Sequence, residues 1–162
     1  MLTARSQGIA EAVRVVHVGW MIGKAFRSAV DLIGFYRHVM DIKIELVSIP
    51  VTDIDRAIAF YTDRVGFTLD HDHRVSEEIR FVQITPPGSA CSILVGHLSE
   101  MPPGSQRGLQ CVVADADLAL AELKKAGIDA QGVDEQPWGR FVSFSDPDGN
   151  TWTYQQIVRP TT

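Results

Sequence analysis

The chain has 162 residues, of which 45% are hydrophobic and 22% charged, and this composition excludes a wholly disordered protein. Its formal net charge of −5 excludes nucleic acid as the main partner class, because phosphate contacts need clustered Lys and Arg. No apolar run reaches the ~20 residues that a membrane span requires, so we expect no membrane partner and a cytoplasmic location.

Residues 1–39 differ from the rest of the chain. They carry five Lys and Arg against two acidic residues, whereas the remainder is acidic. Apolar residues near helical spacing predict a helix over 20–40. Two interpretations stay open: an appended helix that covers an apolar surface or binds a partner, or a spurious upstream start with Met40 as the true first residue. We therefore predict an extension over 1–39 and a domain over 40–162.

The domain contains an internal repeat. The segment VTDIDRAIA at 51–59 is echoed by VADADLALA at 113–121, and Arg-Phe-Val at 80–82 is echoed at 140–142. A repeat of this length indicates a duplicated supersecondary unit. The surface between the two copies is the natural place for function.

The first copy reads as one helix and four strands. A strand is predicted over 42–51, followed by a helix that Asp53 caps and Gly66 ends. Strands over 67–72, 79–85 and 89–96 follow, and Pro86-Pro87-Gly88 makes a turn between the last two. This βαβββ unit, module 1, spans 42–97.

The second copy repeats the order after a Pro- and Gly-rich linker over 98–107. A strand over 109–114 precedes a helix over 115–126, with Asp115 as its cap and Gly127 at its end. Strands are predicted over 130–133, 141–145 and 151–158, with an Asp146–Gly149 turn between the last two. Module 2 therefore spans 108–158.

These motifs carry a family resemblance. The VTDIDRA segment with Phe60-Tyr61 and Gly66-Phe67, together with FSDPDGN at 144–150, resembles the glyoxalase/bleomycin-resistance/dioxygenase group, also called the vicinal oxygen chelate superfamily. The resemblance covers about 42–158. It implies an α+β fold in which two βαβββ modules form a half-open curved sheet barrel around a cleft.

The resemblance also gives the metal-ligand positions of the catalytic members. In this sequence they are Leu46, a position near Gly108, Ile93 and Thr153. Leu, Gly and Ile have no donor atom, and a neutral Thr hydroxyl is a poor ligand for zinc or iron. Shifts of one or two residues bring in Glu45, Ser92, Gln110 or Gln155 and still no histidine. We therefore predict no metal and no cofactor.

A cleft without a metal would be lined by apolar and small polar side chains. Strand alternation places Val95 beside the ligand-position residues, and Tyr154 is a further candidate for the rim. Trp138 could instead plug its loop, and Arg140 could balance acids such as Asp134 and Glu135. The predicted ligand-binding residues are Leu46, Ser48, Gln83, Cys91, Ile93, Gln110, Trp138, Arg140, Thr153 and Gln155.

Three groups are assigned structural or surface roles. Trp152 is expected in the core, because it alternates with Thr153. Cys91 and Cys111 lie in apolar runs and are expected to be buried thiols. His71 and His73 share one strand face, which suits either adventitious metal or a solvated strand end.

The leading hypothesis is a metal-independent small-molecule-binding protein that holds a neutral or aromatic ligand between its modules. The resemblance implies a homodimer. The rival hypothesis is an enzyme, a glyoxalase-like lyase, isomerase or dioxygenase with a divergent metal site. A third is an interaction module whose upstream helix binds a partner.

Overall fold

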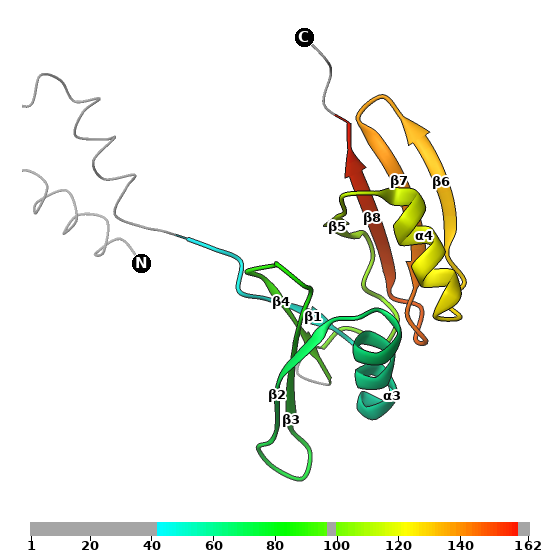
Figure 1. Cartoon of the computed structure of the whole chain (residues 1–162). Helices are drawn as coiled ribbons and strands as arrows, with labels where there is room; N and C mark the ends of the chain where they lie inside the picture. The colour runs from blue at the N-terminus through cyan, green and yellow to red at the C-terminus, as the bar shows by residue number, and fades with distance from the viewer. Residues whose placement is uncertain (1–41, 97–99, 159–162) are drawn as a thin grey trace, which may run out of the picture. The chain divides into compact units, whose positions relative to one another are not determined.

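The computed structural model describes residues 42–96 and 100–158 (Figure 1). The predicted extension over 1–39, with its helix, lies outside the described residues. Module 1 contains β1 (Leu46–Ile49), α3 (Ile54–Ala59), η1 (Phe60–Arg64), β2 (Thr68–Arg74), β3 (Arg80–Thr85) and β4 (Ser92–Val95). The element η1 is a π-helical turn that continues α3.

Module 2 repeats this order (Figure 1). It contains β5 (Leu109–Val112), α4 (Ala116–Lys125), β6 (Gln131–Gln136), β7 (Gly139–Ser145) and β8 (Thr151–Ile157). The strand orders β1-β4-β3-β2 and β5-β8-β7-β6 correspond one to one. In each sheet the first strand runs parallel to the last, and the other pairs are antiparallel. The duplicated βαβββ architecture is confirmed.

The helix boundaries follow the predicted caps. The Asp53 carboxylate accepts a hydrogen bond from the Arg56 N–H at 3.0 Å, and Asp115 accepts from the Asp117 and Leu118 N–H groups. Each helical segment ends before a glycine with positive φ, 85° at Gly66 and 74° at Gly127. A side chain would be strained in this left-handed conformation, so glycine ends both helices.

Several strand boundaries differ from the prediction: β1 and β4 are shorter than the predicted 42–51 and 89–96, and β7 begins at Gly139. Two edge strands are longer than predicted. β2 extends to Arg74 and β6 to Gln136, beyond the predicted 67–72 and 130–133. Both are edge strands in which most residues are exposed, so they lack the alternating apolar pattern that marks a strand. Pairing with β3 and β7 extends them, because tertiary context overrides local propensity.

One hydrophobic core joins the two modules. Tyr61 and Phe67 of module 1 pack on Trp152 of module 2, with ring centroids 5.7 and 5.6 Å from the indole. The Tyr61 hydroxyl donates to Asp146 at 2.7 Å and accepts from the Trp152 indole N–H at 3.2 Å. Burial raises the pKa of Tyr61. Trp152 is only 2% exposed, which confirms its predicted place in the core.

The repeated Arg-Phe-Val segments place an arginine at the same position in each module. Arg80 binds Asp55 and Asp72, both at 2.7 Å. Arg140 binds Asp117 at 2.7 Å and Glu135 at 3.2 Å. Each guanidinium thus ties the first turn of a helix to its sheet. These hydrogen bonds lower the pKa of Asp72 and of Asp117.

Candidate ligand-binding site

Each sheet has one face packed on the core and one face turned away from it, which we call the open face. In module 1, Ile93 and Val95 pair with Ile84 and Val82, and all four are buried in the core. Strand alternation and cross-strand pairing place the intervening residues on the open face. The open face of module 1 comprises Leu46, Ser48, Thr68, His71, His73, Phe81, Gln83, Thr85, Ser92 and Leu94.

The open face of module 2 follows by the same reasoning. Val142, Phe144, Trp152 and Tyr154 belong to the core. The residues that alternate with them, and their cross-strand partners, make up the open face: Gln110, Val112, Gln131, Asp134, Phe141, Ser143, Ser145, Thr151, Thr153 and Gln155.

The predicted placement of Ile93 in the cleft is wrong by one residue. Ile93 pairs with Ile84, whereas Trp152 pairs with Phe144. The connection from β3 to β4 is therefore one residue longer than its counterpart, and a shift of one residue turns a strand side chain to the other face. Ile93 is 3% exposed in the core, and the residue equivalent to Thr153 is Leu94.

Three further predicted cleft or rim residues also face away from the open faces. Val95 and Tyr154 lie in the core, for the same reason of strand parity. Arg140 lies on the helix-packed side, where Asp117 and Glu135 hold it, so its predicted place on the rim is wrong. The alternative, that Arg140 balances local acids, holds for Glu135.

The other predicted residues occupy accessible positions. Leu46, Ser48, Gln83, Gln110, Thr153 and Gln155 lie on the two open faces. Cys91 precedes β4 and is partly buried, with its thiol 3.7 Å from the Ser92 carbonyl. Trp138 is 62% exposed in the turn between β6 and β7, so it does not plug its loop. Its carbonyl accepts from the Gln155 amide at 3.2 Å.

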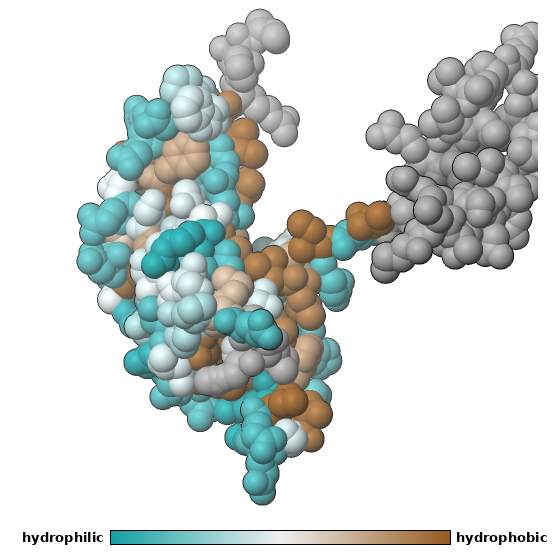
Figure 2. Space-filling view, turned by 180° about the vertical axis from the view of Figure 1, so that it is seen from behind, coloured by the Kyte–Doolittle hydropathy of each residue, from teal (hydrophilic) through white to brown (hydrophobic). Residues whose placement is uncertain are grey.

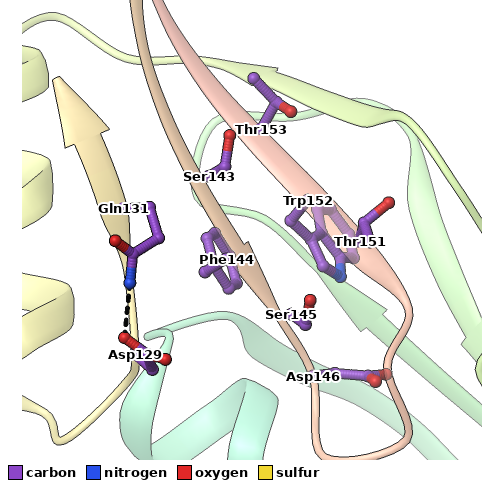
Figure 3. A pocket seen from close by; sticks show the side chains of 9 residues that line it. All are labelled: Asp129, Gln131, Ser143, Phe144, Ser145, Asp146, Thr151, Trp152 and Thr153. Atoms are coloured by element: carbon purple, nitrogen blue, oxygen red, sulfur yellow. Dashed lines mark hydrogen bonds between the residues drawn. The ribbon is translucent and has the colours of Figure 1, made fainter. Parts of the chain in front are cut away.

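A pocket of about 660 Å³ lies over module 2 (Figure 3). Ser143 and Ser145 from β7 and Thr151 and Thr153 from β8 contribute a row of hydroxyl groups. At its edge Gln131 donates to the Asp129 carboxylate at 2.7 Å. The sequence interpretation missed the two serines, although their alternation with buried Val142 and Phe144 was a readable signal.

The polar side chains of module 1 bind one another. The Gln83 amide donates to the Ser92 hydroxyl at 3.0 Å, and the Thr85 and Ser92 hydroxyls are 2.6 Å apart. The Thr85 hydroxyl also binds Asp70. A connected set of hydrogen bonds fixes these side chains and satisfies their polar atoms.

The metal positions of the catalytic relatives do not fit a metal here. After the one-residue correction the side chains are Leu46, Leu94 and Thr153, with Gly108 before β5. A catalytic zinc site needs at least three protein donors, and this set supplies one neutral hydroxyl. Across 42–96 and 100–158, no three His, Cys, Asp or Glu side chains come close enough to share an ion.

The Cys111 thiol is not placed for nucleophilic chemistry. Cys111 lies on the core-facing side of β5, and burial raises the pKa of its thiol, which disfavours the reactive thiolate. In the described part of the chain, no helix is both long and apolar enough to span a membrane.

Comparison with known proteins gives one family. The profile of the Glyoxalase/Bleomycin resistance protein/Dioxygenase superfamily matches residues 37–154. A similar curated sequence is the uncharacterized protein YetH of Bacillus subtilis (strain 168), with 27% identity over 117 residues, 70% of this chain and 98% of YetH.

Two solved structures from Streptomyces sp. CB03234 are similar, each at 38% sequence identity. One is TnmS3, described as an antibiotic binding protein, with a TM-score of 0.69 over 74% of this chain and 99% of TnmS3. The other is described as a glyoxalase/bleomycin resistance protein, with a TM-score of 0.65 over 70% of this chain and 100% of that chain.

Proposed function

This chain belongs to the Glyoxalase/Bleomycin resistance protein/Dioxygenase superfamily, and on that premise we propose that it binds a neutral or aromatic small molecule on its open faces without a metal. The observation that carries the proposal is the chemistry of these faces: no Lys or Arg belongs to either of them. An anionic ligand would find no counter-charge there, and a metal-dependent reaction would find too few donors.

Two of the acids at the edges of the open faces, Asp70 and Asp129, support a neutral ligand. Asp70 binds the Thr85 hydroxyl and Asp129 accepts from Gln131, so each carboxylate already has a neutral partner. The antibiotic-binding description of TnmS3, at 38% identity, supports sequestration of a compound over its turnover. The predicted residues Leu46, Ser48, Gln83, Gln110, Thr153 and Gln155 would contact the ligand, and exposed Trp138 would close over it.

We further propose that a second copy of the chain completes each site. Several hydrogen bonds and an ion pair join the modules, among them Tyr61–Asp146, Arg56–Asp148 and Arg64 to the Ala126 carbonyl. None of these three contacts involves a residue of an open face. In 42–96 and 100–158, no side-chain hydrogen bond or ion pair joins one open face to the other. Neither open face is thus tied to the other by a side-chain contact, and this supports a site that a module of a second copy closes.

The edge strands indicate how the copies would meet. β1 and β5 each pair with one neighbour only, which leaves backbone hydrogen-bonding groups available to another strand. Large apolar side chains are exposed near them, including Ile44 and Val112, and hydrophobic surface gathers along one side of the described unit (Figure 2). Pairing of β1 with β5 of the other copy would cover both features.

A ligand screen with metal analysis tests the proposal. Thermal shifts are measured for the full chain over a panel of neutral aromatic compounds and, in parallel, anionic ones. A ligand at one hundred times its Kd adds about 2.7 kcal/mol to the free energy of unfolding. Shifts confined to neutral compounds, unchanged by a chelator, support the proposal. Stoichiometric Fe, Zn or Ni that resists dialysis would contradict it and favour the enzyme.

A further inference from the structure

The open faces differ from one another in chemistry, and this difference gives the bound ligand an orientation. Resting on the function proposed above, we propose that His71, His73 and Phe81 form an aromatic subsite on module 1 that stacks on the ligand's planar rings. The hydroxyl row of module 2 binds the ligand's oxygen atoms. The ligand is thus an oxygenated polycyclic aromatic compound.

The rings of the subsite come from neighbouring strands. His71 and His73 are two residues apart on β2, so their side chains share a face. Their ring centroids lie 5.8 Å apart with an interplanar angle of 29°. The residues directly opposite on β3 are Gln83 and Phe81. Both imidazoles are exposed, so their ring faces are accessible to a planar ligand, which gains by stacking.

The polar groups beside these rings are already bound. Gln83, Ser92, Thr85 and Asp70 form a continuous hydrogen-bonded set. A ligand that hydrogen-bonds to one of them must break an existing bond, and the net gain is then small. Beside β2 and β3, module 1 therefore offers a ligand its ring faces and the apolar Leu94 side chain, while Leu46 and Ser48 lie on β1.

Module 2 offers the complementary chemistry. The hydroxyls of Ser143, Ser145 and Thr153 line the pocket of about 660 Å³ (Figure 3). Within the described residues they have no side-chain partner. A hydroxyl can donate and accept, so this row suits carbonyl and hydroxyl groups along one edge of a ligand.

A metal ion is the competing occupant of the histidine pair. Two imidazoles fall short of the three protein donors that zinc sites use. The neighbouring Asp72 belongs to the Arg80 ion pair, and Asp70 to the Thr85 hydroxyl. Neither carboxylate is available as a third donor, so stacking is the role the pair can perform.

Two compounds test the orientation in the full-length protein by titration calorimetry. Chrysin is a dihydroxylated flavone, and flavone is its parent without hydroxyl groups. Both carry the same planar rings, and chrysin alone has the additional hydroxyls. The variants are H71A/H73A, which removes the rings, H71F/H73F, which keeps rings but removes imidazole donors, and S143A/T153V, which removes hydroxyls. Glu77→Ala in the exposed β2–β3 connection is the matched control.

The expected results separate the two faces. H71A/H73A should weaken both compounds about tenfold in Kd, because each aromatic pair contributes about 2- to 10-fold. H71F/H73F should bind both within about twofold of the parent protein. S143A/T153V should weaken chrysin about tenfold and flavone by a smaller factor, because flavone keeps the ring carbonyl but lacks the hydroxyl groups. Glu77→Ala should change neither.

Contrary results have distinct meanings. Saturable binding that H71A/H73A leaves unchanged would overturn the aromatic subsite and keep the proposed function. Loss of binding in H71F/H73F, or binding that requires added Zn²⁺, would assign the pair to metal instead of stacking. If neither compound binds the parent protein, while anionic compounds or metal do, the proposed function itself fails.

Discussion

The two modules share a backbone plan but differ in what their open faces present. Module 1 carries the imidazoles of His71 and His73 beside a set of polar side chains that bind one another. Module 2 carries hydroxyls without side-chain partners. By contrast, the core-facing features match closely: a capped helix, a terminal glycine and an arginine bound to the first helical turn. Duplication thus kept the folding determinants and diversified the exposed chemistry.

The core shared by the modules gives the largest expected effect. Trp152→Ala should lower the free energy of unfolding by about 3–5 kcal/mol, because the indole packs on Tyr61, Phe67 and Phe144. Trp138→Ala is the matched control: its side chain is mostly exposed, and a change within about 0.5 kcal/mol is expected. Urea unfolding of both variants measures this. An equal loss of unfolding free energy in both variants would contradict the assignment of Trp152 to the core and Trp138 to the surface.

The hydrogen bonds of Tyr61 come next in size. Tyr61→Phe keeps the ring packing but removes the donor to Asp146 and the acceptor for Trp152. We expect a loss of about 1–3 kcal/mol, because buried partners are left unsatisfied. Phe60→Leu tests packing without these hydrogen bonds. If Tyr61→Phe unfolds at the same urea concentration as the parent protein, the buried hydrogen bonds do not help to join the modules.

The two helix-ending glycines should behave alike. A Cβ at Gly66 meets no atom within 4 Å, whereas at Gly127 it meets the Arg64 guanidinium at 3.3 Å. Positive φ alone should make either alanine variant about 1 kcal/mol less stable. Thermal unfolding measures both. A clearly larger loss in Gly127→Ala would show that the contact with Arg64, which also donates to the Ala126 carbonyl at 2.9 Å, adds to the backbone strain.

The smallest expected effect is the pH dependence of the Arg80 ion pair. Arg80 lowers the pKa of Asp72 in the folded protein. The stabilisation is therefore fully present above the unfolded-state pKa of about 4 and is lost as the pH falls through the lower folded value. Asp72→Asn should flatten the stability profile below about pH 4 and leave its shape at neutral pH unchanged. Glu77→Gln on the neighbouring turn serves as control and should keep the profile of the parent protein. If Asp72→Asn also keeps the parent's stability profile in acid, the prediction is wrong.

Much of the fold was readable because it is encoded locally. Asp53, Asp115, Gly66 and Gly127 act within a few residues of their position, through capping and backbone conformation. The repeat predicted the βαβββ order, and alternation with Thr153 along the strand predicted the core position of Trp152. The edge strands β2 and β6 were shortened in the prediction because their exposed, polar residues carry no apolar alternation.

The site was readable only in part. Gln110, Thr153 and Gln155 of module 2 lie on the open face, where they alternate with large buried residues, and their contact with a ligand stays a prediction. Ile93 was misplaced because the prediction used a constant offset between modules, and one extra residue before β4 changes that offset. Arg140 was misplaced because its partner Asp117 lies on α4, and only packing of α4 on the sheet brings them together.

The sequence by itself determined the duplicated architecture and the helix limits, and it predicted that no imidazole or carboxylate stands at the four metal positions of the family. These depend on residue identity and on contacts within a few residues along the chain. Only the tertiary structure decided which face each strand residue occupies, which hydroxyls are left without partners and where the histidine pair lies. These features depend on the register between paired strands. Inserting a single residue shifts the register and turns the side chains of that strand to the other face of the sheet.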